Sequence, residues 1–319
     1  MDNQFPKTLV EAIRHFSEPQ VAFDFMVGLR WPAGVKCPRC AGSDVHFIST
    51  RKLWECKCCK EKKQFSVRVG TIFEDSALTL DKWLAAIWMI ANAKNGVSSY
   101  EVHRSIGVTQ KTAWFMLQRI RLAMQTGTFE KFSGEVEADE TLIGGRARNM
   151  HADRNRRRGR GTGGVGKAIV MGLLERHDKT KSSKVKAKHL PNVQRKTLHA
   201  EVRENVKPGS ELFTDEWMGY LGLKKDYVHK VINHMECYVK GNVHTNGIEN
   251  FWSLLKRCIK GTYVSVEPFH LFRYLDEQAF RFNLREGDDA SRFIQAVKGI
   301  IGKRLTYDAL IGNTRPETA

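Results

Sequence analysis

Two pairs of cysteines near the start of the chain restrict its fold more than any other feature. Cys37 and Cys40 form one C-x2-C pair, Cys56 and Cys59 form a second, and fifteen residues separate the pairs. This spacing lets four thiolates converge on one ion at about 2.3 Å, which predicts a tetrahedral zinc ribbon. Because four cysteines close the coordination shell, we expect the Zn²⁺ to be structural. Cys58 is an alternative fourth ligand, but Cys56 and Cys59 keep the two pairs symmetric.

The charge of the chain indicates the kind of partner it binds. Its 52 Lys and Arg residues exceed its 35 Asp and Glu residues and give a net charge of +17, which favours a polyanion such as DNA. An acidic membrane surface would also fit the charge, but no run of about 18 apolar residues exists to span a bilayer. The N-terminal sequence lacks the basic and apolar regions of a secretory signal. We therefore expect a cytoplasmic, nucleoid-associated chain with reduced thiols and no membrane partner.

The region after the cysteines has the pattern of a helix-turn-helix. A helix is expected to open after Ser98, a turn at Gly107 suits positive φ, and Thr109 can cap a second helix. An ordinary helical pair is the alternative, but the cysteine module upstream and the net charge favour contact with DNA. The side chains that we expect to face outward from the second helix are Gln110, Lys111, Trp114, Gln118 and Arg121.

A segment rich in Arg and Gly, residues 144–167, follows a segment of strand character at residues 134–143. It holds seven Arg residues and almost nothing apolar, so it cannot build a core and is expected to be a loop or arm. The alternative is a solubilising linker, but so dense a positive charge favours nucleic acid. The Arg residues assigned to DNA binding are Arg154, Arg156, Arg157 and Arg158.

The end of this segment also has the glycine and lysine spacing of a phosphate-binding loop. Ala168, however, stands where the motif needs Ser or Thr, and an apolar strand follows where the motif needs a helix. We interpret this match as chance.

The rest of the chain mixes strand and helix patterns, which indicates an α/β region with a mixed sheet. A strand pair is also expected over Phe65–Phe73, around Gly70. The strands expected later lie at 134–143, 168–175, 184–189, 211–214 and 228–233, and the helices at 194–205, 248–259, 268–283 and 291–302.

The helix expected over residues 248–259 separates its apolar from its polar side chains. At about 100° per residue, one side carries the apolar residues Ile248, Phe251, Leu255 and Cys258. The other side carries Glu249, Ser253, Lys256 and Lys260. That polar face could offer a carboxylate to a metal and an ammonium group to a phosphate. The alternative is the solvated face of an amphipathic helix.

Three carboxylates on separate elements, Asp139, Asp215 and Glu249, could together hold two divalent cations at an attacked phosphate. Mg²⁺, or Mn²⁺ in its place, prefers such oxygen ligands and keeps several waters, so few carboxylates suffice. Each residue alone is weak evidence, because the chain has 35 acidic residues.

Together these motifs resemble the DDE-type insertion-sequence transposases that carry an N-terminal zinc ribbon. The resemblance covers most of residues 20–275 in family order, and the combination is specific although no single motif is. The matching stretches are CPRC…CKCC (37–59), FSVRVGTIFED (65–75), EADETLIGG (137–145), FTDEWMGY (213–220) and HTNGIENFWSLLKR (244–257).

The resemblance implies a multidomain α+β chain with an RNase H-like α/β catalytic domain. In such a domain the first and fourth strands are neighbours, which would bring Asp139 and Asp215 together, and Glu249 would be added from a late helix. Lys256 corresponds to a basic residue that contacts the element end, and Arg257 follows it. Because some relatives have Asn at the third position, Asn246 is the alternative to Glu249. The expected regions are 1–33 (helical), 34–68 (zinc ribbon), 78–126 (helix-turn-helix), 132–283 (catalytic domain) and 284–319 (helical tail).

Three functions are compatible with this reading. A transposase would bind the terminal inverted repeats of its element as a homo-oligomer, cut double-stranded DNA there and join the 3′ end to target DNA. A regulator descended from a transposase would bind DNA without catalysis, but the intact set of three carboxylates argues against it. An RNase H-like nuclease would cut DNA without joining it.

Overall fold

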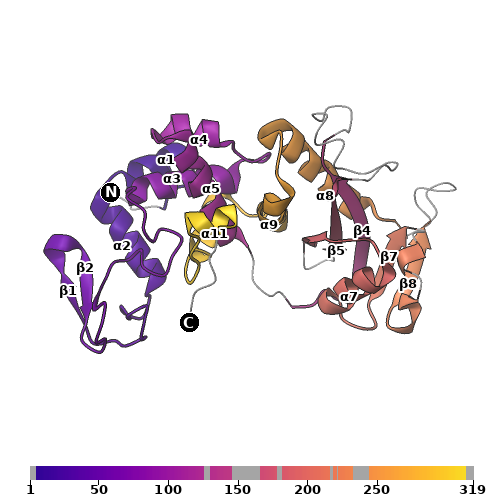
Figure 1. Ribbon diagram of the computed structural model, residues 1–319, viewed down its shortest axis with the longest axis horizontal. Helices are drawn as coiled ribbons and strands as arrows, with labels where there is room; N and C mark the ends of the chain where they lie inside the picture. The colour runs from indigo at the N-terminus through magenta and orange to yellow at the C-terminus, as the bar shows by residue number, and fades with distance from the viewer. Residues whose placement is uncertain are drawn as a thin grey trace. The chain divides into compact units, whose positions relative to one another are not determined.

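A computed structural model of the chain describes residues 5–125, 130–145, 166–177, 182–215, 218–220, 222–232 and 244–313. The chain divides into two compact units (Figure 1). Unit 1 comprises Met1–Thr126 and Gly287–Ala319, and unit 2 comprises Gly127–Glu286. None of the described helices has both the length and the apolar character that crossing a membrane would require.

Unit 1 is built mainly from helices that begin where the sequence provides caps. Thr8 and Ser98 each accept a hydrogen bond from the backbone of a Glu three residues later, and that Glu bonds back, which forms two capping boxes. Gly107 ends its helix in the left-handed region, as its place in the turn predicted. The helices are α1 (Leu9–Phe16), α2 (Pro19–Arg30), α3 (Leu80–Asn92), α4 (Ser99–Ile106), α5 (Gln110–Met124), α10 (Asp289–Lys298) and α11 (Tyr307–Ile311).

The cysteine region folds as a small antiparallel sheet with strand order β1-β2-β3. Its strands are β1 (Val45–Ile48), β2 (Leu53–Cys56) and β3 (Gln64–Phe65). The buried Trp54 ring stacks on Phe23 of α2 at 5.6 Å and on Phe65 at 5.9 Å. These aromatic contacts attach the sheet to the first helices of unit 1.

The strand pair expected over Phe65–Phe73 is wrong, because only Phe65 of this segment lies in a strand. The segment continues as a series of turns in which Ile72 and Phe73 are fully buried. The Thr71 hydroxyl donates to the carbonyl of Arg68 at 2.6 Å and accepts from the amide of Phe73. Such local side-chain bonds compete with a sheet ladder, and alternating apolar residues alone do not reveal them.

The C-terminal helix α10 is an integral part of unit 1. Its Phe293 is fully buried against Phe16 of α1 and Trp88 of α3, at ring distances of 5.7 and 4.9 Å. The helix was expected to reach Gly302 but ends at Lys298. A Cβ on Gly299 would lie 2.1 Å from the carbonyl oxygen of Ala123, so this close approach of two chain segments requires glycine.

Unit 2 contains a five-stranded mixed sheet with strand order β6-β5-β4-β7-β8. β4 pairs antiparallel with β5 and parallel with β7, so the first and fourth strands of the unit are neighbours, as expected. The strands are β4 (Glu135–Ile143), β5 (Ala168–Glu175), β6 (Lys184–Leu190), β7 (Glu211–Asp215) and β8 (Val228–Ile232).

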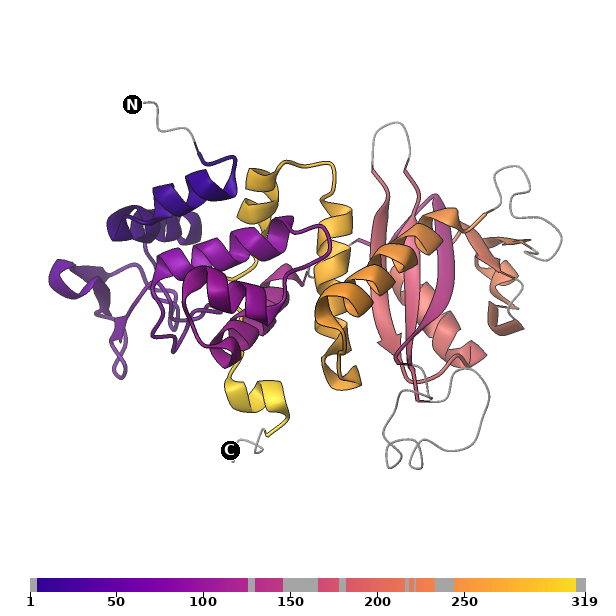
Figure 2. The same ribbon diagram turned by 90° about the horizontal axis from the view of Figure 1, so that it is seen from above.

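Helices cover both faces of this sheet and enclose two apolar cores (Figure 2). On one face α7 (Arg195–Asn205) buries Leu198 and Val202. On the other face lie α8 (Asn246–Arg257) and α9 (Leu271–Asn283), which also contact each other. Helices therefore cover both faces of the sheet over its central strands.

Replacing Phe293 with Ala should destabilise unit 1, because the lost ring leaves a cavity among three helices. We expect a loss of about 3–5 kcal/mol in the free energy of unfolding, measured in urea. The control Ile311→Ala removes an apolar side chain of α11 that is 40% exposed and should cost less than about 1 kcal/mol. Equal small losses would show that α10 does not contribute to the core.

Candidate active site and metal centres

The four predicted zinc ligands converge in the structure. Among the described residues, Cys37, Cys40, Cys56 and Cys59 form the only group of three or more candidate ligands whose donor atoms all lie within 4.8 Å. The Sγ atoms of Cys37 and Cys59 are 3.7 Å apart, and those of Cys40 and Cys56 are 3.5 Å apart. Sulfurs bound to one tetrahedral zinc ion lie about 3.8 Å apart. The cluster therefore fits a structural Zn²⁺, and Cys58 is outside it.

Substituting single cysteines separates the four ligands from their neighbour. Cys59→Ser should sharply reduce the zinc that copurifies with the chain, because a thiolate ligand is lost. Cys58→Ser should retain the zinc content of the unmodified protein. Elemental analysis of both variants measures the difference, and loss of zinc from Cys58→Ser alone would assign the fourth ligand to Cys58.

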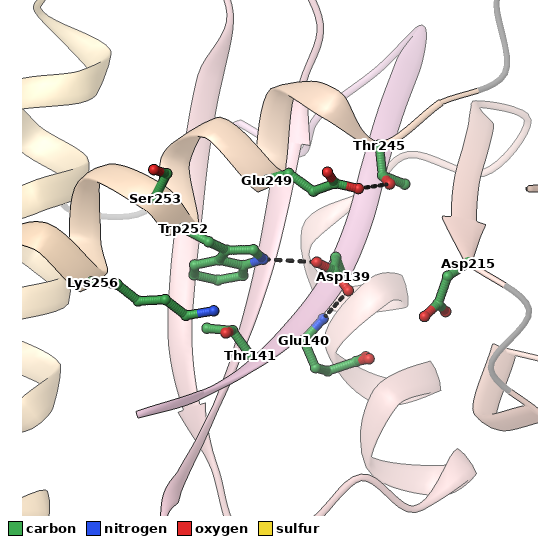
Figure 3. A pocket seen from close by; sticks show the side chains of 9 residues that line it. All are labelled: Asp139, Glu140, Thr141, Asp215, Thr245, Glu249, Trp252, Ser253 and Lys256. Atoms are coloured by element: carbon green, nitrogen blue, oxygen red, sulfur yellow. Dashed lines mark hydrogen bonds between the residues drawn. The ribbon is translucent and has the colours of Figure 1, made fainter. Parts of the chain in front are cut away.

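Two strands of unit 2 bring the first two carboxylates to one place. Parallel pairing joins Glu135–Glu137 of β4 to Glu211–Phe213 of β7. Asp139 and Asp215 each lie two residues beyond this pairing, in the same chain direction. Both line one cavity of about 500 Å³, together with Glu249 (Figure 3).

Helix α8 supplies the rest of this cavity through its polar face. Ile248, Phe251 and Leu255 are fully buried in the core, as their spacing predicted. Glu249, Ser253 and Lys256 consequently lie along the opposite side and line the cavity. Figure 3 shows Lys256 extending toward Thr141 of β4, on the same side of the helix as Glu249.

Asp139 is held by two hydrogen bonds. Its Oδ2 accepts from the indole Nε1 of Trp252 at 2.9 Å, and its Oδ1 accepts from the amide of Glu140 at 2.8 Å (Figure 3). Burial raises the pKa of Asp139 to about 6, the charges of Asp215 and Glu249 add to the rise, and the two hydrogen bonds oppose it. Sequence reasoning missed Trp252, although its position one turn after Glu249 on the predicted helix was a usable signal.

A fourth carboxylate, Glu140, also lines the cavity. It accepts a hydrogen bond from the hydroxyl of Tyr220, which is fully buried. Burial raises the pKa of Glu140 to about 7, and the charges of Asp139 and Asp215 contribute. Neither Glu140 nor Tyr220 was among the candidate site residues.

The two candidates for the third carboxylate position lie in different cavities. Glu249 accepts a hydrogen bond from the Thr245 hydroxyl at 2.9 Å and shares the cavity of Asp139. Asn246 lines a second cavity of about 720 Å³, with Arg176 and His244. The geometry therefore favours Glu249 over Asn246 as the partner of the two aspartates.

The polar residues expected to face outward from α5 have mixed outcomes. Gln110 donates to Ser99 at 2.8 Å and is partly buried, Lys111 is exposed beside the Tyr307 ring, and Trp114 is partly buried.

The prediction that Gln118 and Arg121 face outward is wrong, because their exposed fractions are 0% and 1%. Helices α3, α4 and α10 all contact α5, and the contribution of α10 comes from the far end of the chain. A buried Arg121 cannot contact DNA in this structure.

Of the other residues assigned to DNA, Lys256 is partly buried in the cavity wall and Arg257 is exposed. Arg154, Arg156, Arg157 and Arg158 lie outside the described residues.

The carboxylate cavity suits a hard divalent cation. Its donors are carboxylate oxygens from Asp139, Asp215 and Glu249, the ligand type that Mg²⁺ and Mn²⁺ prefer. Burial is the main cause of the raised pKa of Asp139, and the negative charges of Asp215 and Glu249 contribute to it. The three groups lie farther apart than the thiols, so binding would require their side chains to close inward.

The pH dependence of stability should reveal the raised pKa of Asp139. Its folded pKa of about 6 lies above its ordinary value of 3.8, so the folded state loses stability as pH rises from about 4 to about 6. Asp139→Asn removes this titration, and the variant should gain on the order of 2 kcal/mol relative to the unmodified protein across that range. Unfolding of both proteins in magnesium-free buffer measures the difference. A difference that stays constant with pH would contradict the raised pKa.

Comparisons with known families agree with both parts of this description. A family described as "ISXO2-like transposase domain" matches residues 131–283, which contain the mixed sheet and its cavity. A second, described as "Transposase zinc-ribbon domain", matches residues 18–62, which contain the four-cysteine cluster.

Two individual proteins are also similar to this chain. An uncharacterized protein in transposable element ISH50 of Halobacterium salinarum is 26% identical over 257 residues, which cover 77% of this chain and 85% of that protein. An uncharacterized transposase-like protein of Haemophilus influenzae is 37% identical over 112 residues, which cover 34% of this chain and 90% of that protein.

Proposed function

The chain belongs to the ISXO2-like transposases that carry an N-terminal zinc ribbon, and we propose that it cuts the DNA ends of its own element and joins them to target DNA. The observation that carries this proposal is the cavity shared by Asp139, Asp215 and Glu249. A non-catalytic DNA-binding protein would have no need to hold three like charges together against their mutual repulsion.

The proposed roles of the cavity residues follow from their chemistry. Asp139, Asp215 and Glu249 would hold divalent cations, which when bound activate the attacking oxygen and stabilise the leaving one. The ammonium group of Lys256, on the same side of α8 as Glu249, would bind a DNA phosphate beside them. Trp252 would keep Asp139 oriented through the indole bond to Oδ2. Positioning and charge would supply the catalysis, so we expect no covalent intermediate with the protein.

Recognition of the element ends is assigned to unit 1. The four-cysteine ribbon and the helices α4 and α5, as a helix-turn-helix, would bind the terminal inverted repeats. Lys111 is the exposed cation nearest the start of α5, where recognition helices contact base edges. Because joining requires two element ends to be held together, we propose that the chain acts as a homo-oligomer on DNA.

Two rival functions make different predictions. A regulator without catalysis would bind element ends but leave them uncut in Mg²⁺. An RNase H-like nuclease would cut the ends but yield no molecule in which an element end is joined to target DNA. The joined product therefore distinguishes the proposed function from both.

Two substitutions on the first turn of α8 test the assignment of the third carboxylate. Glu249→Gln keeps the side-chain shape but removes a metal-binding charge, so cleavage of labelled element ends in Mg²⁺ should fall at least about 100-fold. Asn246→Ala, three residues earlier, alters the other cavity and should lower cleavage by less than about threefold. Gel-shift binding of element ends should be unchanged in both variants. Strong loss from Asn246→Ala with full activity of Glu249→Gln would reverse the assignment.

A further inference from the structure

We propose that Glu137 is a positioning residue for the reaction, because it fixes the register of α8 against β4 and thereby sets Glu249 and Lys256 opposite Asp139. This inference rests on the proposed function. Glu137 lies two residues before Asp139 on β4, and its side chain is 1% exposed. It does not line the carboxylate cavity, so its role differs from those of the residues that do.

Two hydrogen bonds join β4 to α8, one helical turn apart. Oε2 of Glu137 accepts from the amide of Ile248 at 2.8 Å, and Oδ2 of Asp139 accepts from the indole of Trp252 at 2.9 Å. Two residues along a strand span about 6.6 Å, and four residues along a helix span about 6 Å. The two bonds therefore match in spacing, and together they fix both the position and the rotation of α8. Glu249 follows Ile248 directly, so the same register determines where its carboxylate points.

Glu137 lies beside the N-terminal turn of α8, where a carboxylate is electrostatically favourable. Ile248 is the third residue of α8, and its amide has no acceptor within the helix itself. A carboxylate at a helix N-terminus interacts favourably with the helix dipole. Glu137 thus satisfies a buried donor and compensates a partial charge with one side chain.

Arg176 forms an ion pair with this buried carboxylate. Its Nε donates to Oε1 of Glu137 at 2.8 Å, and its guanidinium also donates to the carbonyl of His244, just before α8. A buried carboxylate without such a partner would destabilise the fold. Arg176 therefore links β4, the end of β5 and the approach to α8 in one network.

Two glycines let the helix come close enough for these bonds to form. A Cβ on Gly247 would lie 2.9 Å from Oε2 of Glu137, and a Cβ on Gly172 of β5 would lie 2.6 Å from Ile248 and Trp252. Both distances are shorter than contacts that real Cβ atoms make, so glycine at these two positions lets α8 pack this closely against β4 and β5.

Glu135 provides a matched control. It also pairs with Arg176, through Nη1 at 2.8 Å, but it is partly exposed, and the amide of Ile248 donates to Glu137. Substituting either Glu removes one carboxylate from the same arginine, but the Glu137 substitution also removes the acceptor of the Ile248 amide. A difference between the two variants therefore reports the bond to α8.

The experiment compares Glu137→Ala with Glu135→Ala in the full chain by three readouts. Hydrogen exchange of the peptide at the start of α8 should quicken in Glu137→Ala alone. Mn²⁺ affinity, followed by electron paramagnetic resonance, should fall about tenfold in that variant, because supporting residues of this kind tune metal sites. Single-turnover cleavage of element ends should fall about 100-fold per folded molecule. Glu135→Ala should stay within about twofold of the unmodified protein in all three.

Equal behaviour of the two variants in hydrogen exchange and Mn²⁺ affinity would overturn the proposal. If Glu137→Ala does not fold, Glu137→Leu compared with Glu135→Leu decides, because Leu fills a similar space but offers no acceptor to the amide of Ile248. Reduced Mn²⁺ affinity in Glu137→Leu alone supports the proposal, and equal affinity refutes it. An unmodified protein that neither cuts nor joins DNA would refute the proposed function, whereas exchange and Mn²⁺ binding would still test the register of α8.

Discussion

Helix α8 lies so close to the central strands that Gly172 cannot carry a side chain. Two requirements are met by this close contact. The apolar side chains of α8, including Ile248 and Leu255, must be buried, and the carboxylates of Glu137 and Asp139 on β4 need hydrogen-bond donors, which α8 provides. Because both requirements are met in one register, the polar face of α8 is presented to the cavity. The places of Glu249, Trp252 and Lys256 in the cavity follow from that register.

The same arrangement explains why the cavity should take up cations. Burial raises the pKa of Asp139, and repulsion from the carboxylates of Asp215 and Glu249 adds to the rise. A divalent cation bound among them would relieve that repulsion, so the proposed site depends on its metal. Unit 1 shows a comparable dependence, since its helices are completed by α10 from the far end of the chain, through Phe293.

The sequence predicted the regular elements well where local signals were sufficient. Caps such as Thr109, the C-x2-C pairs and the periodicity of α8 each act within a few residues, so their outcome does not depend on distant contacts. Predictions failed where contacts between segments distant in the sequence determine the burial or hydrogen bonding of a residue. Arg121 is buried on α5, which contacts α3, α4 and α10, and the indole bond of Trp252 requires β4 beside α8. The resemblance supplied the grouping of Asp139, Asp215 and Glu249, which spacing alone could not provide.

The central claim is that these three carboxylates bind divalent cations next to a phosphate of the DNA. Anomalous X-ray scattering from crystals of the full chain with element-end DNA and Mn²⁺ tests it most directly. The account predicts Mn²⁺ bound by side-chain oxygens of Asp139, Asp215 and Glu249, with a DNA phosphate beside Lys256. Manganese bound elsewhere, with the three side chains directed apart in the presence of DNA, would contradict it.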